Sequence, residues 1–159
     1  MGLEFKTIDL ARDMETCIRF RKDSYLISFG NLDQFEKDIL TYERRMIERI
    51  GYFPQGNCHL WRGGEIIGQT EMKFVEDERI GYVSFFYLAP EVRGMGYGEA
   101  LHLRAVREFK AVGKECLKLS VSPENGRALA YYRKMGWTSL GPRPGREHML
   151  LFSYDLMGA

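Results

Sequence analysis

Short runs in which apolar side chains alternate with polar ones, or follow one another, divide the chain into seven candidate strands. Glycine, proline or charged residues bound these runs. The Gly-Gly pair at residues 63–64 separates the second run from the third, which is typical of a hairpin. The predicted strands are Leu3–Ile8, Cys58–Trp61, Ile66–Phe74, Ile80–Ala89, Leu117–Val121, Trp137–Leu140 and His148–Leu156.

Apolar residues spaced three or four apart predict four helices. They cover about residues 14–29, 33–50, 99–112 and 125–135. Asp13 is expected to cap or charge the start of the first helix, and Gly30 is expected to end it. Gly51 is the expected stop of the second helix.

The order of these elements is β-α-α-β-β-β-α-β-α-β-β, which predicts an α/β domain with a mixed sheet and helices on both faces. We expect one domain over residues 1–159. The unit from Phe85 to Val121 is a strand, a crossover helix and a strand, so its two strands are expected to be parallel. Ligands of such sheets lie at the carboxyl ends of strands, where this chain carries a glycine-rich loop.

The loop Arg93-Gly-Met-Gly-Tyr-Gly98 follows a predicted buried strand and precedes a helix. Glycine lets the backbone approach a ligand closely, and a helix N-terminus favours an anion, so the loop is a candidate phosphate site. It is not a Walker loop, and the dinucleotide fingerprint requires Gly or Ala where this chain has Glu99. The alternative is a strand-to-helix turn that binds nothing.

The loop resembles the R-x-x-G-x-G signature of the GNAT N-acetyltransferase superfamily, with Arg93, Gly96 and Gly98 at its named positions. A second stretch, residues 125–137, resembles the family pattern that follows in the same order. Its matching residues are Asn125, Ala128, Tyr131, Tyr132, Gly136 and Trp137. Two motifs at the expected strand and helix positions are more specific than either motif alone.

The resemblance implies a GNAT-like, mostly antiparallel mixed sheet of about seven strands and acetyl-CoA as co-substrate, without a metal. It implies binding of acetyl-CoA by Phe86, Tyr87, Leu88, Arg93, Gly94, Met95, Gly96, Tyr97, Gly98, Asn125 and Tyr132. Met95 and Tyr97 would contribute backbone N–H groups, and Arg93 would contact phosphate or brace the turn. Tyr131 occupies the packing position of the pattern and Tyr132 the general-acid position.

The implied reaction is direct attack of a primary amine on the thioester in a ternary complex, with a backbone N–H near Leu88 bonding the thioester oxygen. Tyr132 would protonate the departing thiolate. The family often uses a glutamate as base, and Glu71 is the nearest candidate in the sequence. Gln69 and Lys73 share its face, which favours a solvent-exposed Glu71 over a catalytic one, and ordered water is a rival base.

Composition limits the classes of partner. Lys and Arg number 23 against 22 Asp and Glu, and the net charge of +1 provides no field for nucleic acid or an anionic membrane. No apolar run reaches membrane-spanning length and the N-terminus has no signal-peptide pattern, so a cytoplasmic location is expected. The three cysteines are widely spaced and predict neither zinc nor redox chemistry.

The acceptor is not identified by the sequence. We expect the acceptor to be a small-molecule amine rather than a protein. Two alternatives are an acetyltransferase that modifies protein N-termini or lysine side chains, and a catalytically idle sensor that binds acyl-CoA. A homodimer is left open. Acceptor choice is expected to depend on residues 25–32, the hairpin turns and residues 141–147. Phe29, Tyr52 and Phe53 are candidate lining residues of an acceptor pocket, although single aromatic residues near loops are common.

Overall fold

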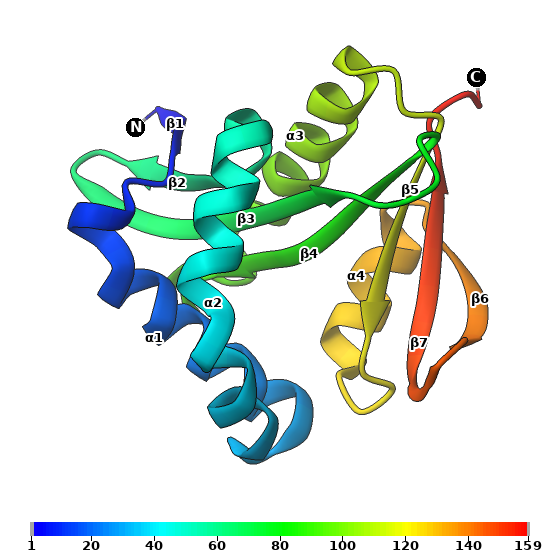
Figure 1. Cartoon of the computed structure of the whole chain (residues 1–159), viewed down its shortest axis with the longest axis horizontal. Coiled ribbons are helices and arrows are strands. Elements are labelled where there is room, and N and C mark those ends of the chain that lie inside the picture. The colour runs from blue at the N-terminus through cyan, green and yellow to red at the C-terminus, as the bar shows by residue number, and fades with distance from the viewer. Residues whose placement is uncertain (1, 159) are drawn as a thin grey trace.

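The computed structural model describes residues 2–158, which form a seven-stranded sheet and four α-helices (Figure 1). The strands are β1 (Leu3–Thr7), β2 (Cys58–Arg62), β3 (Glu65–Phe74), β4 (Ile80–Leu88), β5 (Cys116–Val121), β6 (Thr138–Arg143) and β7 (Arg146–Asp155). The helices are α1 (Leu10–Phe29), α2 (Asp33–Tyr52), α3 (Gly98–Ala111) and α4 (Gly126–Lys134), with short 3-10 helices η1 (Pro54–Gly56) and η2 (Pro90–Val92).

The sheet is mixed and mostly antiparallel, as the sequence predicts. Its strand order is β1-β2-β3-β4-β5-β7-β6, and β4–β5 is its parallel pair. The other neighbouring pairs are antiparallel. The predicted order of helices and strands is therefore confirmed, and so is the parallel pairing across the unit that contains the glycine loop.

Helices cover both faces of the sheet. On β3, Glu71 contacts Arg21 of α1 and Tyr42 of α2, whereas the next residue, Met72, belongs to a core cluster with Phe109 of α3. Successive residues of a strand point to opposite faces, so α1 and α2 lie on one face and α3 on the other. Within residues 2–158, no helix combines the length and the apolar character that crossing a membrane requires.

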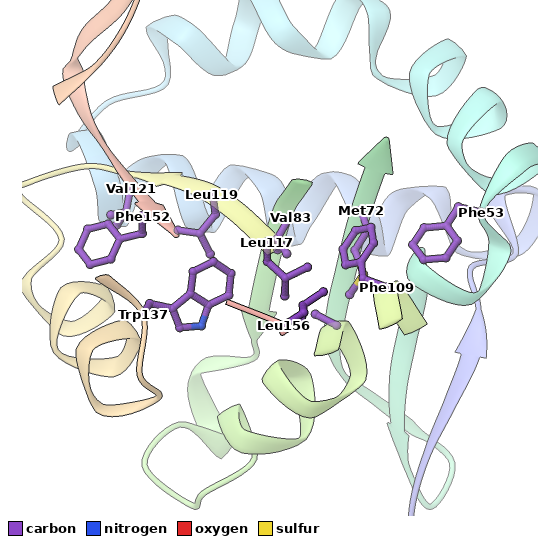
Figure 2. Packing of buried hydrophobic residues seen from close by; sticks show 11 residues of the cluster. Phe53, Met72, Val83, Phe109, Leu117, Leu119, Val121, Trp137, Phe152 and Leu156 are labelled. Carbon is purple, nitrogen blue, oxygen red and sulfur yellow. The ribbon is translucent and has the colours of Figure 1, made fainter. Parts of the chain in front are cut away.

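The main hydrophobic core lies between the sheet and the helices α3 and α4. Its buried members are Phe53, Met72, Val83, Ala105, Phe109, Leu117, Leu119, Val121, Trp137, Phe152 and Leu156. Figure 2 shows these side chains following one another along the sheet from Phe53 to Phe152. Because strands β3, β4, β5 and β7 all contribute, this core holds the central strands in place beneath the loop that follows β4.

Two helix ends differ from the sequence prediction. The Asp9 side chain, not Asp13, caps α1 by accepting a hydrogen bond from the backbone N–H of Arg12. Asp13 lies inside the helix at a kink, where it supplies the acidic residue of the first turn, so its predicted charge at the helix start is confirmed. Helix α2 passes through Gly51 to Tyr52, so the predicted stop at Gly51 is wrong. The helical hydrogen bonding continues there, because the backbone N–H of Phe53 donates to the carbonyl of Arg49.

A β-bulge interrupts the pairing of β3 with β4. Glu71 lies opposite Phe85 and Met72 lies opposite Val83, which leaves Ser84 as an extra residue on β4. Because of this extra residue, side chains two positions apart across the bulge point to opposite faces of the sheet instead of the same face. Val83 therefore packs in the core beneath α3, whereas Phe85 packs on the other face in a cluster with Phe20 of α1.

Strands β4 and β5 pair only at their beginnings. Residues 80–82 of β4 lie beside residues 116–118 of β5, and no later residue of β4 pairs with β5 in the described chain. From there β4 continues along β3 to Leu88, while β5 continues along β7 to Val121. The two strands meet near one end and then separate (Figure 1), which opens the sheet at their carboxyl ends.

The close packing of β4 against α3 gives a test of the fold. A Cβ atom on Gly81 would overlap the ring of Phe109, and Phe109 is fully buried. We expect Gly81→Ala to lower the free energy of unfolding by about 1–3 kcal/mol through overpacking. Gly64→Ala is the matched control, because Gly64 lies in open space without a positive φ and its substitution changes only the unfolded-chain entropy. Equal stability of the two variants in urea unfolding would contradict this packing.

Candidate active site

The glycine loop presents a row of free backbone donors. Gly94 and Gly96 have φ angles of 79° and 86°, a left-handed conformation that favours glycine. In residues 2–158, the backbone N–H groups of residues 94–98 donate to no protein acceptor. Five successive unpaired N–H groups immediately before and at the start of α3 are suited to an anion with several oxygen atoms.

Gly98 is required for a different reason. It begins α3, and a Cβ atom at this position would lie 2.7 Å from Cε1 of Tyr131. The Tyr131 hydroxyl donates a hydrogen bond to the carbonyl oxygen of Gly98. Tyr131 therefore joins α4 to the first residue of α3, in keeping with its predicted packing position.

Arg93 braces the turn. Its Nε donates to the carbonyl oxygen of Leu88 at 2.9 Å, and its Nη2 lies 2.9 Å from Oδ2 of Asp23 on α1. Tyr87 donates to the same carboxylate oxygen. Of the two roles that the sequence leaves open for Arg93, the structure contains the bracing contacts, and they connect the loop to both β4 and α1.

A cavity of about 540 Å³ lies between this loop, the end of β4, α1 and α4. Nine of the eleven predicted cofactor residues line it: Phe86, Tyr87, Leu88, Arg93, Gly94, Gly96, Gly98, Asn125 and Tyr132. Met95 and Tyr97 do not; the Met95 side chain is exposed and the Tyr97 hydroxyl accepts a hydrogen bond from Arg62. We call this space the loop cavity.

Two cationic residues of α4 that the sequence analysis did not single out also line the loop cavity, Arg127 and Lys134. Nη2 of Arg127 lies 3.6 Å from the position that a Cβ atom on Gly94 would occupy. They escape notice in the sequence because charged residues on a helix are usually solvated. Only the packing of α4 beside the loop places them there.

Asn125 starts α4 and faces the loop cavity. Its Oδ1 accepts a hydrogen bond of 3.1 Å from the backbone N–H of Ala128, so it is the N-cap. Its Nδ2 donates to the Ser28 hydroxyl at 3.5 Å. The residue thus fixes the start of α4 relative to α1.

A second cavity of about 380 Å³ lies where β4 separates from β5. It is lined by residues 82–86 of β4, by residues 119–121 of β5 with Ser122 after them, and by side chains from α1, α2, β3, α4 and the β6–β7 hairpin. We call it the cleft cavity. It adjoins the loop cavity at five shared lining residues, Ser24, Phe86, Asn125, Ala128 and Tyr132.

Tyr132 lies where the two cavities meet. Its ring packs against Trp137 and Phe152, with centroid separations of 5.7 and 6.1 Å. No hydrogen bond to its hydroxyl is formed within residues 2–158. Burial raises the pKa of Tyr132, so the phenol stays protonated at neutral pH and its proton is available to a group that arrives from either cavity.

Glu71 is fully buried, so the exposed alternative for it is wrong. Its carboxylate accepts hydrogen bonds from both Nε and Nη2 of Arg21, from Tyr42 at 2.7 Å and from Gln69 at 2.7 Å, and Nη1 of Arg49 lies 3.7 Å away. Burial alone would raise the pKa of Glu71, but the charge and hydrogen bonds of Arg21, with those of Tyr42 and Arg49, lower it. Glu71 is not a lining residue of either cavity.

The three aromatic residues considered for the acceptor pocket lie in different places. Phe29 lines the cleft cavity. Tyr52 and Phe53 do not; both pack against Phe74, and Phe53 also packs against Phe109 in the core. Within residues 2–158, no three His, Cys, Asp or Glu side chains gather in a metal-binding arrangement.

The profile of the Acetyltransferase (GNAT) family matches residues 18–137. The chain belongs to this family. The matched segment contains the loop, Tyr132 and the strands that separate around the cleft cavity.

Curated relatives include two bacterial mycothiol acetyltransferases. The one from Streptomyces bingchenggensis is 32% identical over 99 residues, which cover 60% of this chain and 32% of that protein. The one from Amycolatopsis mediterranei is 34% identical over 112 residues, which cover 65% of this chain and 37% of that protein. The matches span about a third of the length of these relatives.

Solved structures share the fold over the whole chain. The PaiA N-acetyltransferase of Thermoplasma acidophilum, crystallised with coenzyme A, superposes with a TM-score of 0.78, covering 98% of this chain and 99% of that one. The two sequences are 19% identical, so this similarity shows the fold alone.

The ion cluster around Glu71 predicts a pH-dependent stability. Glu71→Gln should lower the free energy of unfolding by about 3–5 kcal/mol at pH 7, because Arg21 and Arg49 lose their buried countercharge. Since folding lowers the pKa of Glu71, its contribution is complete above the ordinary pKa of 4.5 and is lost as the pH falls through the folded value. In urea unfolding from pH 7 to pH 3, the gap between wild type and variant should therefore stay constant down to about pH 4.5 and narrow below it, by at most about 1.4 kcal/mol per pH unit. Glu43→Gln, at an exposed position of α2, should show no gap at any pH; a Glu71→Gln gap that stays constant over this whole range would refute the prediction.

Proposed function

We propose that this chain transfers the acetyl group of acetyl-CoA to the primary amine of a small molecule, by direct attack within a ternary complex. The observation that carries the proposal is the row of free N–H groups at residues 94–98, beside a cavity that adjoins a second cavity at Tyr132. One cavity would take the coenzyme and the other the acceptor. The two reactants would then meet at the carboxyl end of β4, where holding them together supplies much of the rate enhancement.

The N–H groups of residues 94–98 would bind the diphosphate of coenzyme A, with the start of α3 adding the positive end of its dipole. Arg127 and Lys134 would add positive charge from the opposite wall. Phe86–Leu88 and Asn125 line the path from the loop to Tyr132 and would contact the pantetheine arm. The residues present therefore fit the coenzyme in charge and position.

In the proposed reaction, the amine nitrogen forms a bond to the thioester carbonyl carbon and the carbon–sulfur bond breaks. Tyr132 donates its proton to the sulfur, the amine gives up a proton to water, and the Tyr132 phenolate then recovers a proton from water. A phenol with an ordinary pKa of about 10 protonates a thiolate with a pKa of about 8.5 against the gradient in water, and the burial that raises the pKa of Tyr132 makes this transfer less favourable still. The transfer therefore depends on the position of Tyr132 at the junction and on stabilisation of its anion.

We assign Glu71 to positioning rather than to proton transfer. Its carboxylate oxygens already accept several hydrogen bonds, its pKa is lowered, and it lines neither cavity. It holds Arg21 and Arg49, both of which line the cleft cavity. A pH–rate profile of Glu71→Gln that keeps the acidic limb of the wild type would agree with this role, whereas loss of that limb would make Glu71 the base.

A small-molecule acceptor is favoured over a protein by the size of the cleft cavity, about 380 Å³. That volume lies within the range of small-ligand sites. The named relatives, mycothiol acetyltransferases, are consistent with a small acceptor. Because the chain spans only part of those relatives, their substrate is not carried over to it.

Coenzyme binding can be tested by substituting two glycines that have the same left-handed backbone conformation. Gly96 and Gly113 have φ angles of 86° and 82°, and neither has a heavy atom within 4 Å of its added Cβ. Alanine in this conformation costs about 1–2 kcal/mol at either site. In calorimetric titration with coenzyme A, we expect Gly96→Ala to weaken binding at least tenfold and Gly113→Ala, at the distal end of α3, to bind like wild type. Wild-type protein that is folded and binds no coenzyme A would refute the proposed function.

The neighbouring tyrosines of α4 give a second test. At saturating acetyl-CoA, we expect Tyr132→Phe to lower kcat by about 100-fold with little change in the dissociation constant for coenzyme A, since only the proton donor is lost. Tyr131→Phe removes the hydrogen bond to Gly98 and should raise that dissociation constant more than it lowers kcat. Release of free thiol with a panel of amines is the measurement. Unchanged turnover in Tyr132→Phe would remove Tyr132 from the mechanism.

A further inference from the structure

The cleft cavity is strongly cationic. Six basic residues line it, namely Arg21, Arg45, Arg49, Lys73, Arg143 and Arg146, against one acidic lining residue, Asp38. The chain as a whole has a net charge of only +1. The excess of positive charge is therefore a local property of this cavity, contributed by α1, α2, β3 and the β6–β7 hairpin.

Part of this charge is neutralised within the protein. Glu71 pairs with Arg21 and lies 3.7 Å from Arg49. Arg45 has no carboxylate within 4 Å in the described residues and keeps its charge, but it is held by hydrogen bonds to the backbone carbonyl of Asp38 and to the Thr41 hydroxyl. These contacts hold three of the guanidinium groups along one wall of the cavity.

The remaining cations have no carboxylate within 4 Å in the described part of the chain. Arg143 donates to the hydroxyl groups of Tyr82 and Ser120 at 3.3 and 3.1 Å. The Lys73 ammonium lies 5.1 Å from the centroid of the Tyr82 ring. Burial lowers the pKa of Lys73, and the charges of Arg49 and Arg143 lower it further, as expected for a cation whose neighbours share its sign. Arg146 is exposed at the rim.

Ser84 adds an unused hydrogen-bonding group to the same wall. Its Oγ is buried and has no hydrogen-bond partner in the described residues. It is the extra residue of the β4 bulge, and it lines the cleft cavity. A buried hydroxyl without a partner is uncommon in folded proteins, and here a bound ligand would supply one.

We propose that the cleft cavity binds an anionic group of the acceptor, so that the substrate is an amine that also carries a carboxylate or a phosphate. This inference rests on the proposed acetyltransferase function. The anionic group lies against Lys73, Arg143 and Arg146, where unpaired cations favour it, and Ser84 donates a further hydrogen bond. The amine lies at the other end of the cavity, beside Tyr132.

The same charges act on the amine. Nearby cations disfavour an ammonium ion and lower the pKa of a bound amine, which increases the neutral fraction that can attack the thioester. An acceptor that carries only positive charges, such as a polyamine, meets repulsion without the compensating ion pairs. The cavity therefore selects by charge and assists deprotonation without a dedicated carboxylate base.

Matched pairs of amines test the proposal through release of free thiol from acetyl-CoA. The pairs are phosphoethanolamine with ethanolamine and β-alanine with β-alaninamide, in which the second member carries a neutral group in place of the anionic one, and spermidine serves as the cationic member. We expect the anionic member of at least one pair to have a kcat/KM at least tenfold above its neutral partner and above spermidine. The pair that shows the preference distinguishes a phosphate from a carboxylate. A preference for the neutral or cationic members would overturn the inference.

Variants locate the preference in the cavity. Lys73→Met and Arg146→Met should each raise KM for the anionic acceptor at least fivefold and reduce the anionic-over-neutral ratio. Arg44→Met is the control, because Arg44 is exposed on α2 beside Arg45 and does not line the cavity. Equal ratios in Lys73→Met, Arg44→Met and wild type would show that the charges of the cleft do not select the acceptor.

A binding measurement separates this inference from the proposed function. Calorimetry with inorganic phosphate and with glutarate, on wild-type protein saturated with coenzyme A, should detect binding that Lys73→Met weakens at least fivefold. Absence of both signals in protein that binds coenzyme A overturns the anion site while leaving the acetyltransferase function in place. Failure to bind coenzyme A at all contradicts the proposed function itself.

Discussion

The arrangement of this molecule depends on the early end of parallel pairing between β4 and β5. Their ladder covers only residues 80–82 and 116–118, after which each strand follows its other neighbour. A sheet that separates in this way exposes strand edges and polar backbone groups that a ligand can use. The glycine loop follows β4 directly, so the free N–H groups of residues 94–98 and the opening between the strands belong to one continuous site.

Contacts on both faces of the sheet hold β4 and β5 apart at their carboxyl ends. Val83 and Leu119 lie in the core with α3, and they anchor β4 and β5 where the strands begin to separate. On the other face, Glu71 holds Arg21 and Arg49 against β3, and the bulge at Ser84 places Phe85 on that face too. The buried ion cluster stabilises the wall of the cleft and supplies part of its charge, so the stability of the fold and the charge of the proposed acceptor site depend on the same residues.

Much of the fold could be predicted from the sequence, because local patterns encode it: alternation and helical spacing gave the order of all eleven helices and strands. Two errors concern local helix ends, and one comes from contacts between distant segments. Gly51 continues α2 since the backbone hydrogen bonds do not require a side chain, and Asp9 precedes Asp13 as the cap. Glu71 shares its strand face with polar residues, which suggests exposure, but partners 29 and 50 residues away in the sequence enclose it.

The same limit applies to the site. The motifs located the loop, Asn125 and Tyr132, because these residues lie close together in the sequence and have fixed backbone roles. The cationic residues of the cleft come from α1, α2, β3 and the β6–β7 hairpin, and no short pattern connects them. The net charge of the chain does not show these cations either, because acidic residues elsewhere on the chain balance them. A net charge near zero therefore excludes a uniformly basic surface but says nothing about a single cavity, where the local field acts on the ligand.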